Sequence, residues 1–137
     1  DTKEWIKDPG HFDRKLDHDQ WLAQVCRIVR KMKGTQIPKD KVGFADLYDV
    51  SDDWIPIYDK SDLNGFYMAI GTSGNQFKTA PVVGLCMAKL IDQCEKGYEH
   101  DHEPIEVIVP YTKQTLNMGQ YARNRSIHNE SSLSVYG

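Results

Sequence analysis

The sequence predicts an α+β fold, because two helical apolar patterns flank a short strand that is apolar on both faces. The helices are expected over residues 17–33 and 77–93, and the strand over residues 66–70. A strand without polar alternation is typical of a buried position in a sheet. With 137 residues, the chain is long enough to form a single core.

Residues 1–16 are charged and are expected to form a loop. The first helix then begins at Asp17 or Asp19, either of which can accept hydrogen bonds from free N–H groups, and it ends near Lys33 before Gly34. Its apolar residues form one broad stripe, as in a helix that packs on a core. They are Trp21, Leu22, Val25, Cys26, Ile28, Val29 and Met32.

The segment between the helices is predicted to be mostly extended. A strand is expected over residues 42–50, and Pro56 restricts residues 54–58 to an edge or irregular strand, since proline donates no hydrogen bond. Asn64 and Gly65 predict a tight turn before the central strand. Beyond the second helix and Gly97, residues 105–109 are expected to form a strand and residues 111–117 a strand or turn. Residues 118–137 are expected to be extended.

A loop of small and polar residues joins the central strand to the second helix. Gly71 and Gly74 permit positive φ, and the N–H groups at a helix start have no partners within the helix. Together they favour a site for a phosphate, a carboxylate or a polarised carbonyl, although an ordinary strand-to-helix turn is the alternative. Lys78 opposes the helix dipole, which points to a ligand. Thr72 and Phe77 occupy the glycine positions of a P-loop, which argues against triphosphate binding.

Three segments around this loop resemble a known family. They are Tyr48-Asp-Val-Ser-Asp-Asp-Trp-Ile-Pro-Ile-Tyr58, Asn64-Gly-Phe-Tyr-Met-Ala-Ile-Gly-Thr-Ser-Gly-Asn-Gln-Phe-Lys78 and Ala80-Pro-Val-Val-Gly84. This pattern is similar to the C-terminal portion of the FAD-dependent amine oxidoreductases, which include D-amino acid, glycine and sarcosine oxidases and dimethylglycine dehydrogenases. The similarity extends over about residues 43–92.

The resemblance implies that the chain is a C-terminal fragment of a two-domain FAD-dependent oxidoreductase. Residues 1–47 would end the substrate-binding domain, residues 48–97 would return to the FAD-binding domain with its last strand and helix, and residues 98–137 would be a C-terminal extension. The N-terminal Gly-x-Gly-x-x-Gly motif of that family does not occur in this sequence. We therefore expect the isolated chain to be inactive and its main partner to be the remainder of the same polypeptide.

The resemblance also implies a role for each residue of the loop. FAD would bind along Gly71, Thr72, Ser73, Gly74, Asn75, Gln76, Phe77 and Lys78. The helix would then point its N–H groups at the flavin C2 carbonyl and N1, where they stabilise the reduced anion. Lys78 would bind a substrate carboxylate and Tyr48 would line the substrate pocket, so both are candidate catalytic residues.

Two positions depart from the family pattern. Gln76 replaces the second loop glycine of sarcosine oxidases, and Asp46 replaces the cysteine that bonds covalently to flavin in those enzymes. FAD is therefore expected to bind without a covalent link through this segment. The predicted reaction is hydride transfer to flavin from an amine or amino acid, with sarcosine-like or dimethylglycine-like substrates.

Composition restricts the other classes of function. A net charge of −3 with mixed signs favours neither nucleic acid nor an anionic membrane. Three cysteines without a Cys-x-x-Cys spacing indicate reduced thiols and a cytoplasmic protein. Residues 99–103 contain two histidines and three carboxylates, but a solvated acidic loop is favoured there and no metal site is predicted. The alternative to the enzyme is a non-enzymatic anion-binding or protein-interaction module.

Overall fold

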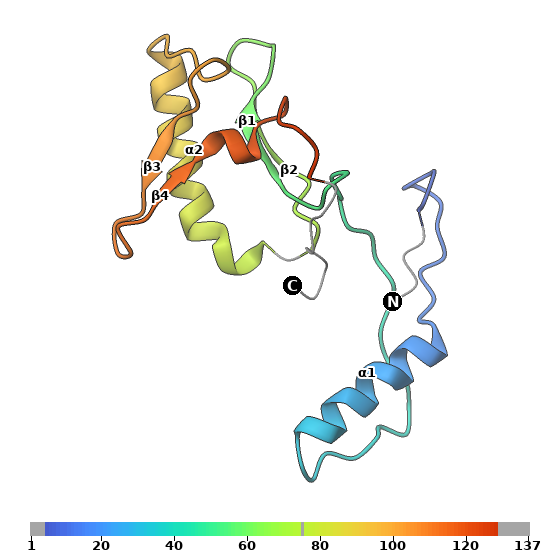
Figure 1. Cartoon of the computed structure of the whole chain (residues 1–137). Coiled ribbons are helices and arrows are strands. Elements are labelled where there is room, and N and C mark those ends of the chain that lie inside the picture. The colour runs from blue at the N-terminus through green and yellow to red at the C-terminus, as the bar shows by residue number, and fades with distance from the viewer. Residues whose placement is uncertain (1–4, 75, 129–137) are drawn as a thin grey trace. The chain divides into compact units, whose positions relative to one another are not determined.

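The computed structural model describes residues 5–74 and 76–128 (Figure 1). The chain divides into two compact units, Asp1–Leu47 and Tyr48–Gly137. The described residues contain two α-helices and two antiparallel sheets of two strands each, so the predicted α+β class is confirmed. The assignment of residues 1–47, 48–97 and 98–137 to parts of an oxidoreductase stays a prediction.

The first unit contains the helix α1 (His18–Lys31). Asp17 caps it as predicted, because its carboxylate accepts a hydrogen bond of 2.7 Å from the Gln20 N–H group. The helix ends two residues earlier than expected, before Gly34 adopts a φ of 88°. The strand predicted over residues 42–50 does not form. Its backbone hydrogen bonds are isolated: the Ala45 N–H group donates to the Arg14 carbonyl, and the Asp49 carbonyl accepts the Ser73 N–H group.

The second unit begins with a hairpin of β1 (Ile57–Lys60) and β2 (Tyr67–Ile70). β1 starts directly after Pro56, as expected from the missing N–H group. Gly65, with a φ of 73°, closes the turn as predicted. The expectation that β2 is buried on both faces is wrong. Phe66 beside it is 55% exposed and Ile70 is 47% exposed, because no further strand covers the hairpin among the described residues.

A short 3₁₀ turn, η1 (Phe77–Thr79), leads into the helix α2 (Ala80–Glu95). Pro81 lies in the first turn of α2, as predicted, where its missing N–H group costs nothing. Gly97, with a φ of 87°, follows the end of the helix. Only Cys86 and Leu90 of the predicted apolar face are fully buried. Leu85 and Ile91, also predicted for this face, are 38% and 37% exposed.

The chain then forms a second hairpin of β3 (Glu106–Ile108) and β4 (Thr115–Asn117), followed by the 3₁₀ turn η2 (Met118–Tyr121). The predicted strands are therefore present, but residues 118–121 are not extended. Asn117 explains the difference, because its side chain caps the turn by accepting the Gly119 N–H group at 2.8 Å.

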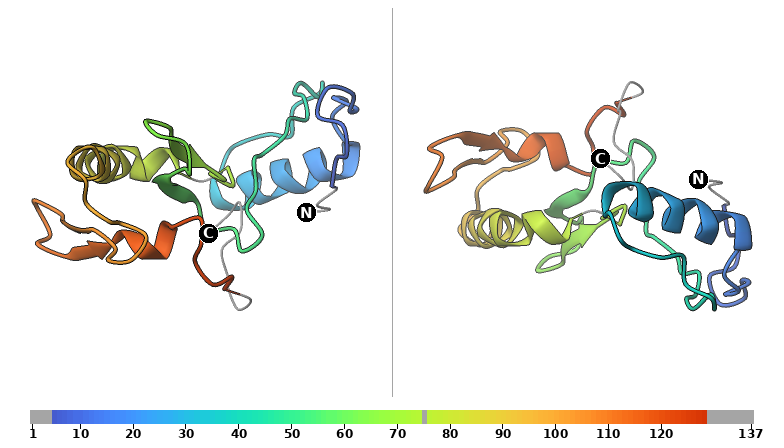
Figure 2. Two further views of the ribbon diagram at one scale, coloured as in Figure 1. Left: turned by 90° about the horizontal axis from the view of Figure 1, so that it is seen from above. Right: turned by 90° about the horizontal axis from the view of Figure 1, so that it is seen from below.

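One small core joins the two hairpins to α2. It consists of Tyr58, Cys86, Leu90, Ile105, Val107 and Met118. In both views of Figure 2, α2 and η2 lie alongside β1, so residues after Gly97 pack with the segment before them. Within the described parts of the chain, neither helix combines the length and the apolar character needed to cross a bilayer.

Candidate functional site

The loop that joins β2 to η1 turns sharply because three of its residues have positive φ. The values are 67° for Gly71, 53° for Ser73 and 75° for Gly74. Glycine adopts these angles at little cost, whereas Ser73 is held there by complete burial and by its hydroxyl, which donates to the Gly71 carbonyl at 3.1 Å. Asn75, one of the predicted FAD-binding residues, lies outside the described residues.

The first N–H groups of this loop bind a carboxylate of the chain itself. Asp49 accepts hydrogen bonds from the Gly71 N–H group at 2.7 Å and the Thr72 N–H group at 3.1 Å, and from the Thr72 hydroxyl at 2.7 Å. The Ser73 N–H group donates to the Asp49 carbonyl at 2.9 Å. Desolvation would raise the pKa of Asp49, but the hydrogen bonds from Thr72 and Gly71 lower it below the ordinary value. Asp49 therefore fixes the shape of the loop.

The next N–H groups have no such partner. Among the residues that the structure describes, none accepts a hydrogen bond from the N–H groups of Gly74, Phe77 or Lys78. No described side chain caps η1 or α2, so none of these residues neutralises the partial positive charge of the helix start. These three groups can donate to an electron-rich atom of a ligand.

The side chains at this point differ in their surroundings. Phe77 is 96% exposed, and Lys78 is exposed without an ion pair to any described carboxylate. Gln76 uses its side chain within the protein instead. Its Oε1 atom accepts hydrogen bonds from the Thr79 hydroxyl at 2.8 Å and the Tyr58 hydroxyl at 3.3 Å. Gln76 thus supports the start of the helical segment.

Tyr48, the predicted pocket residue, lies directly against the loop. A Cβ atom at Gly74 would be 2.3 Å from Cε1 and 2.4 Å from Cδ1 of the Tyr48 ring. Only glycine leaves room for the ring at this distance. The structure therefore brings Tyr48 together with the predicted cofactor loop.

Replacing Gly74 with alanine should lower the free energy of unfolding by about 1–3 kcal/mol, because the new methyl group meets Tyr48 and the residue has a positive φ. Gly84→Ala is the matched control. A Cβ atom there has no neighbour within 4 Å, so alanine should stabilise α2 by about 1 kcal/mol. Urea unfolding of both variants checks this. Equal stabilisation by the two substitutions would contradict the contact between Tyr48 and Gly74.

Asp46, which stands at the position of the flavin-linking cysteine in the family pattern, belongs to the first unit. It is exposed, and its carboxylate accepts a hydrogen bond of 2.9 Å from the Leu47 N–H group. A carboxylate cannot form the thioether that a cysteine forms with flavin.

A second cluster of charged residues centres on Asp59 of β1, which is fully buried. Its Oδ2 atom accepts hydrogen bonds from the Arg123 N–H group at 2.8 Å and from Arg123 Nη1 at 3.1 Å. Its Oδ1 atom accepts the Lys60 N–H group at 2.7 Å. These hydrogen bonds connect β1 to Arg123, which lies 64 positions later in the sequence.

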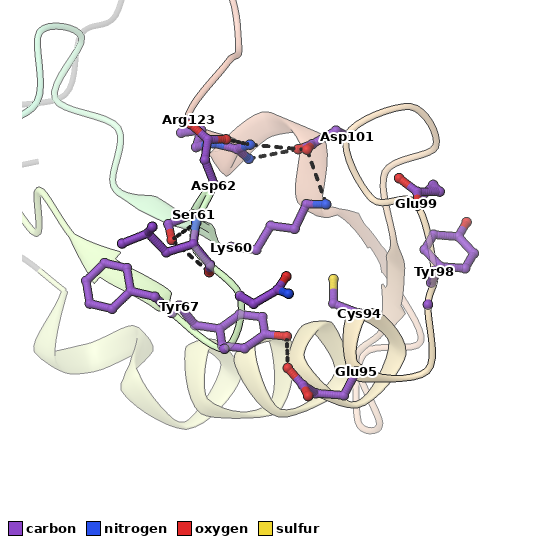
Figure 3. Close-up of a pocket in the computed structure, with 15 residues that line it drawn as sticks. Lys60, Ser61, Asp62, Tyr67, Cys94, Glu95, Tyr98, Glu99, Asp101 and Arg123 are labelled. Carbon is purple, nitrogen blue, oxygen red and sulfur yellow. Dashed lines mark hydrogen bonds and ion pairs between the residues drawn. The ribbon is translucent and has the colours of Figure 1, made fainter.

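Arg123 also binds carboxylates nearer the surface (Figure 3). Its guanidinium contacts Asp101 at 2.8 Å and Asp62 at 2.6 Å, and Lys60 contacts Asp101 at 3.2 Å. Hydrogen bonds from Arg123 lower the pKa of Asp101 to about 2. These residues line one side of an open cavity of about 620 Å³, to which residues 71–74 and 76–78 contribute nothing. The cluster is thus separate from the predicted cofactor loop.

His100 lies beneath this cluster, so the expected solvated loop is wrong at this residue. It is 1% exposed, and its Nδ1 atom accepts a hydrogen bond of 3.1 Å from the Ile105 N–H group. The neutral ring therefore carries its proton on Nε2, which is 3.5 Å from Asp59 Oδ1. Burial lowers the pKa of His100 although Asp59 and Asp101 act in the opposite direction. Among the described residues no group of His, Cys, Asp and Glu side chains is arranged to hold a metal.

The buried His100 should make the free energy of unfolding fall as the pH decreases through about 6.5, the pKa of an unfolded histidine. Its pKa is lower in the folded state, so the unfolded chain binds more protons in this range. Urea unfolding at pH 5 and pH 7 tests this, with His100→Asn as the control, because asparagine can still accept the Ile105 N–H group. The variant should lose this pH dependence. An unchanged pH profile in His100→Asn would assign the effect to another group.

Asp53 forms a second buried ion pair, with Arg125. The two contacts are 2.6 Å from Nη2 to Oδ1 and 3.1 Å from Nε to Oδ2, and the side chains are 9% and 1% exposed for Arg125 and Asp53. Desolvation would raise the pKa of Asp53, but the hydrogen bond from Arg125 lowers it to about 2. Arg125 Nη2 also donates to the Ile55 carbonyl at 2.7 Å.

Sequence reasoning missed the residues that hold these contacts. They are Asp49, Asp59, Arg123 and Arg125. The one signal available in the sequence was the pair Arg123 and Arg125, which are separated by one residue in the segment 118–137 that was predicted to be extended. The comparisons add no further residue, since no protein-family model, no curated protein and no solved structure matches this chain.

Proposed function

We propose that this chain is the C-terminal region of an FAD-dependent oxidoreductase that oxidises an amine or amino acid by hydride transfer to flavin. The order of strand, glycine loop and helix agrees with the motif that suggested this family. The observation that carries the proposal is the set of N–H groups at Gly74, Phe77 and Lys78 for which the described residues offer no acceptor, at a loop with positive φ.

These N–H groups fit the chemistry of a flavin. A flavin that accepts a hydride gains negative charge at its pyrimidine edge, and fixed donors aimed at that edge stabilise the charge without reorganisation. The loss of one such donor costs about 3 kcal/mol in the reaction barrier. Residues 71–73 would shape the loop through Asp49, and Gly74 with residues 76–78 would face non-covalently bound FAD.

The proposed substrate carries a carboxylate. Lys78 has no anionic partner among the described residues, and an ammonium group at a helix start is unfavourable without one. A sarcosine-like or dimethylglycine-like substrate would supply that charge. Tyr48, against Gly74, would contribute an aromatic wall to the substrate pocket.

The proposed enzyme requires further polypeptide around the β1–β2 hairpin. Phe66 and Ile70 are about half exposed, as expected for a strand that a neighbouring part of the same protein covers. We infer that the isolated chain neither retains FAD nor turns over substrate. The free thiols of Cys26, Cys86 and Cys94 agree with the proposed cytoplasmic location.

An anion-binding or protein-interaction module is the second candidate, because the same N–H groups and Lys78 suit any small anion. Isothermal titration of the 137-residue chain with phosphate, acetate and FAD separates the two. The fragment of an oxidoreductase should bind none of them tightly. Saturable binding of phosphate or acetate that disappears in Lys78→Met would favour the module instead.

A further inference from the structure

The predicted cofactor loop lies on the segment formed by residues 49–55. Asp49 binds the N–H groups of Gly71 and Thr72. Ser51 packs against the open side of Gly71, where a Cβ atom would be 3.3 Å from the Ser51 Cβ atom and 3.5 Å from its backbone nitrogen. The position of the loop backbone therefore depends on where residues 49–51 lie.

Asp53 folds this segment into a turn. Its Oδ1 atom accepts the Ile55 N–H group at 3.1 Å and the Ser51 hydroxyl at 3.2 Å. The Ser51 hydroxyl is also 2.7 Å from the Ile55 carbonyl. A carboxylate whose side chain is 1% exposed and that makes several hydrogen bonds holds its neighbours in one arrangement only while its charge is balanced.

Arg125 supplies that balance from the C-terminal segment. Its guanidinium forms the two-point contact with Asp53 and binds carbonyls on both sides, Ile55 at 2.7 Å and Ala122 at 3.0 Å. The planar fork of arginine fits this arrangement, which a lysine ammonium can satisfy only in part. The contacts thus run from Arg125 through Asp53 and Ser51 to Gly71.

We propose that Arg125 is a positioning residue for the ligand loop, acting through Asp53 and residues 49–51 and without touching the ligand. The inference rests on the proposed function in one respect, namely that the loop carries the ligand. It assigns to the C-terminal segment a role in shaping a binding site that lies much earlier in the sequence, at residues 71–78.

Hydrogen exchange of the full chain tests this without any flavin. In Arg125→Gln, exchange of the Gly71, Thr72 and Ser73 amides should accelerate about tenfold or more relative to the amides of Cys86 to Leu90 in α2. A variant that destabilises the whole second unit would accelerate the exchange of both sets of amides equally. The ratio of the two exchange rates therefore measures the local effect on the loop. Arg125→Lys should give an intermediate ratio. Should Arg125→Gln fail to fold, Arg125→Lys provides the measurement.

Arg123→Gln is the matched control. Like Arg125, Arg123 is an arginine shielded from solvent that binds carboxylates. Its three carboxylate partners are Asp59, Asp62 and Asp101, and none of these contacts reaches residues 49–51. Arg123→Gln should therefore leave the ratio of loop to α2 exchange rates unchanged. Equal ratios in the Arg123 and Arg125 variants, or no change in Arg125→Gln, would overturn the proposal.

A separate FAD titration of the complete polypeptide keeps the two proposals distinct. If both hold, Arg125→Gln should weaken FAD binding by about tenfold, while Arg123→Gln changes it less than twofold. A protein that shows the exchange effect but binds no FAD would disprove the oxidoreductase and retain the positioning role. Equal FAD affinity in wild type and Arg125→Gln would disprove the positioning role alone.

Discussion

Replacing Asp59 with alanine should lower the free energy of unfolding of the second unit by about 3–5 kcal/mol. The carboxylate is fully buried and accepts two hydrogen bonds from Arg123, while the imidazole of His100 lies at 3.5 Å. Without it, the Arg123 N–H group loses its acceptor and the link between β1 and the C-terminal segment is broken. Urea unfolding followed by circular dichroism measures the change.

Asp62→Ala is the control for this prediction. Asp62 contacts the same guanidinium at 2.6 Å, but its side chain is 89% exposed. An ion pair in contact with water contributes only about 0–1 kcal/mol, so the substitution should have little effect. An equal decrease in the free energy of unfolding in the two variants would show that the contribution of Asp59 does not depend on its burial.

If the proposed oxidoreductase is correct, Lys78→Met in the complete polypeptide should raise KM for a carboxylated amine by about 10- to 100-fold. The substitution keeps much of the side-chain volume and removes the charge that would bind the substrate carboxylate. A neutral amine of similar size should show almost no change in KM, because it makes no contact with the ammonium group. Steady-state kinetics with both substrates provides the comparison.

Lys89→Met controls for the loss of a surface charge. Lys89 is exposed in α2 and forms no ion pair with the described residues. Its replacement should leave both KM values unchanged. If Lys78→Met raised KM equally for charged and neutral amines, the proposed contact with a carboxylate would be wrong.

Local features of the fold were predictable from the sequence because neighbouring residues determine them. Asp17 caps α1 through a residue three positions away, Pro81 fits the first turn of α2, and Gly65 closes the hairpin turn. The failures concern long-range packing. The apolar composition of residues 66–70 predicts burial, but burial requires a partner surface, and β2 has only β1 beside it among the described residues.

The candidate site shows the same limit. The glycines of the loop indicated positive φ correctly, since that preference is intrinsic to the residue. The acceptor of the loop N–H groups could not be predicted, because Asp49 is 22 positions before Gly71 and is one of many carboxylates in the sequence. Arg125 is 72 positions from Asp53, and its role follows only from the folded structure.

The most direct test of the proposed oxidoreductase is the visible absorbance of the complete polypeptide after desalting. We expect a flavin band that is bleached anaerobically by a sarcosine-like or dimethylglycine-like amine and is retained in Lys89→Met. The 137-residue chain alone should show no such band. A correctly folded complete polypeptide that neither retains nor binds added FAD would disprove the proposed oxidoreductase.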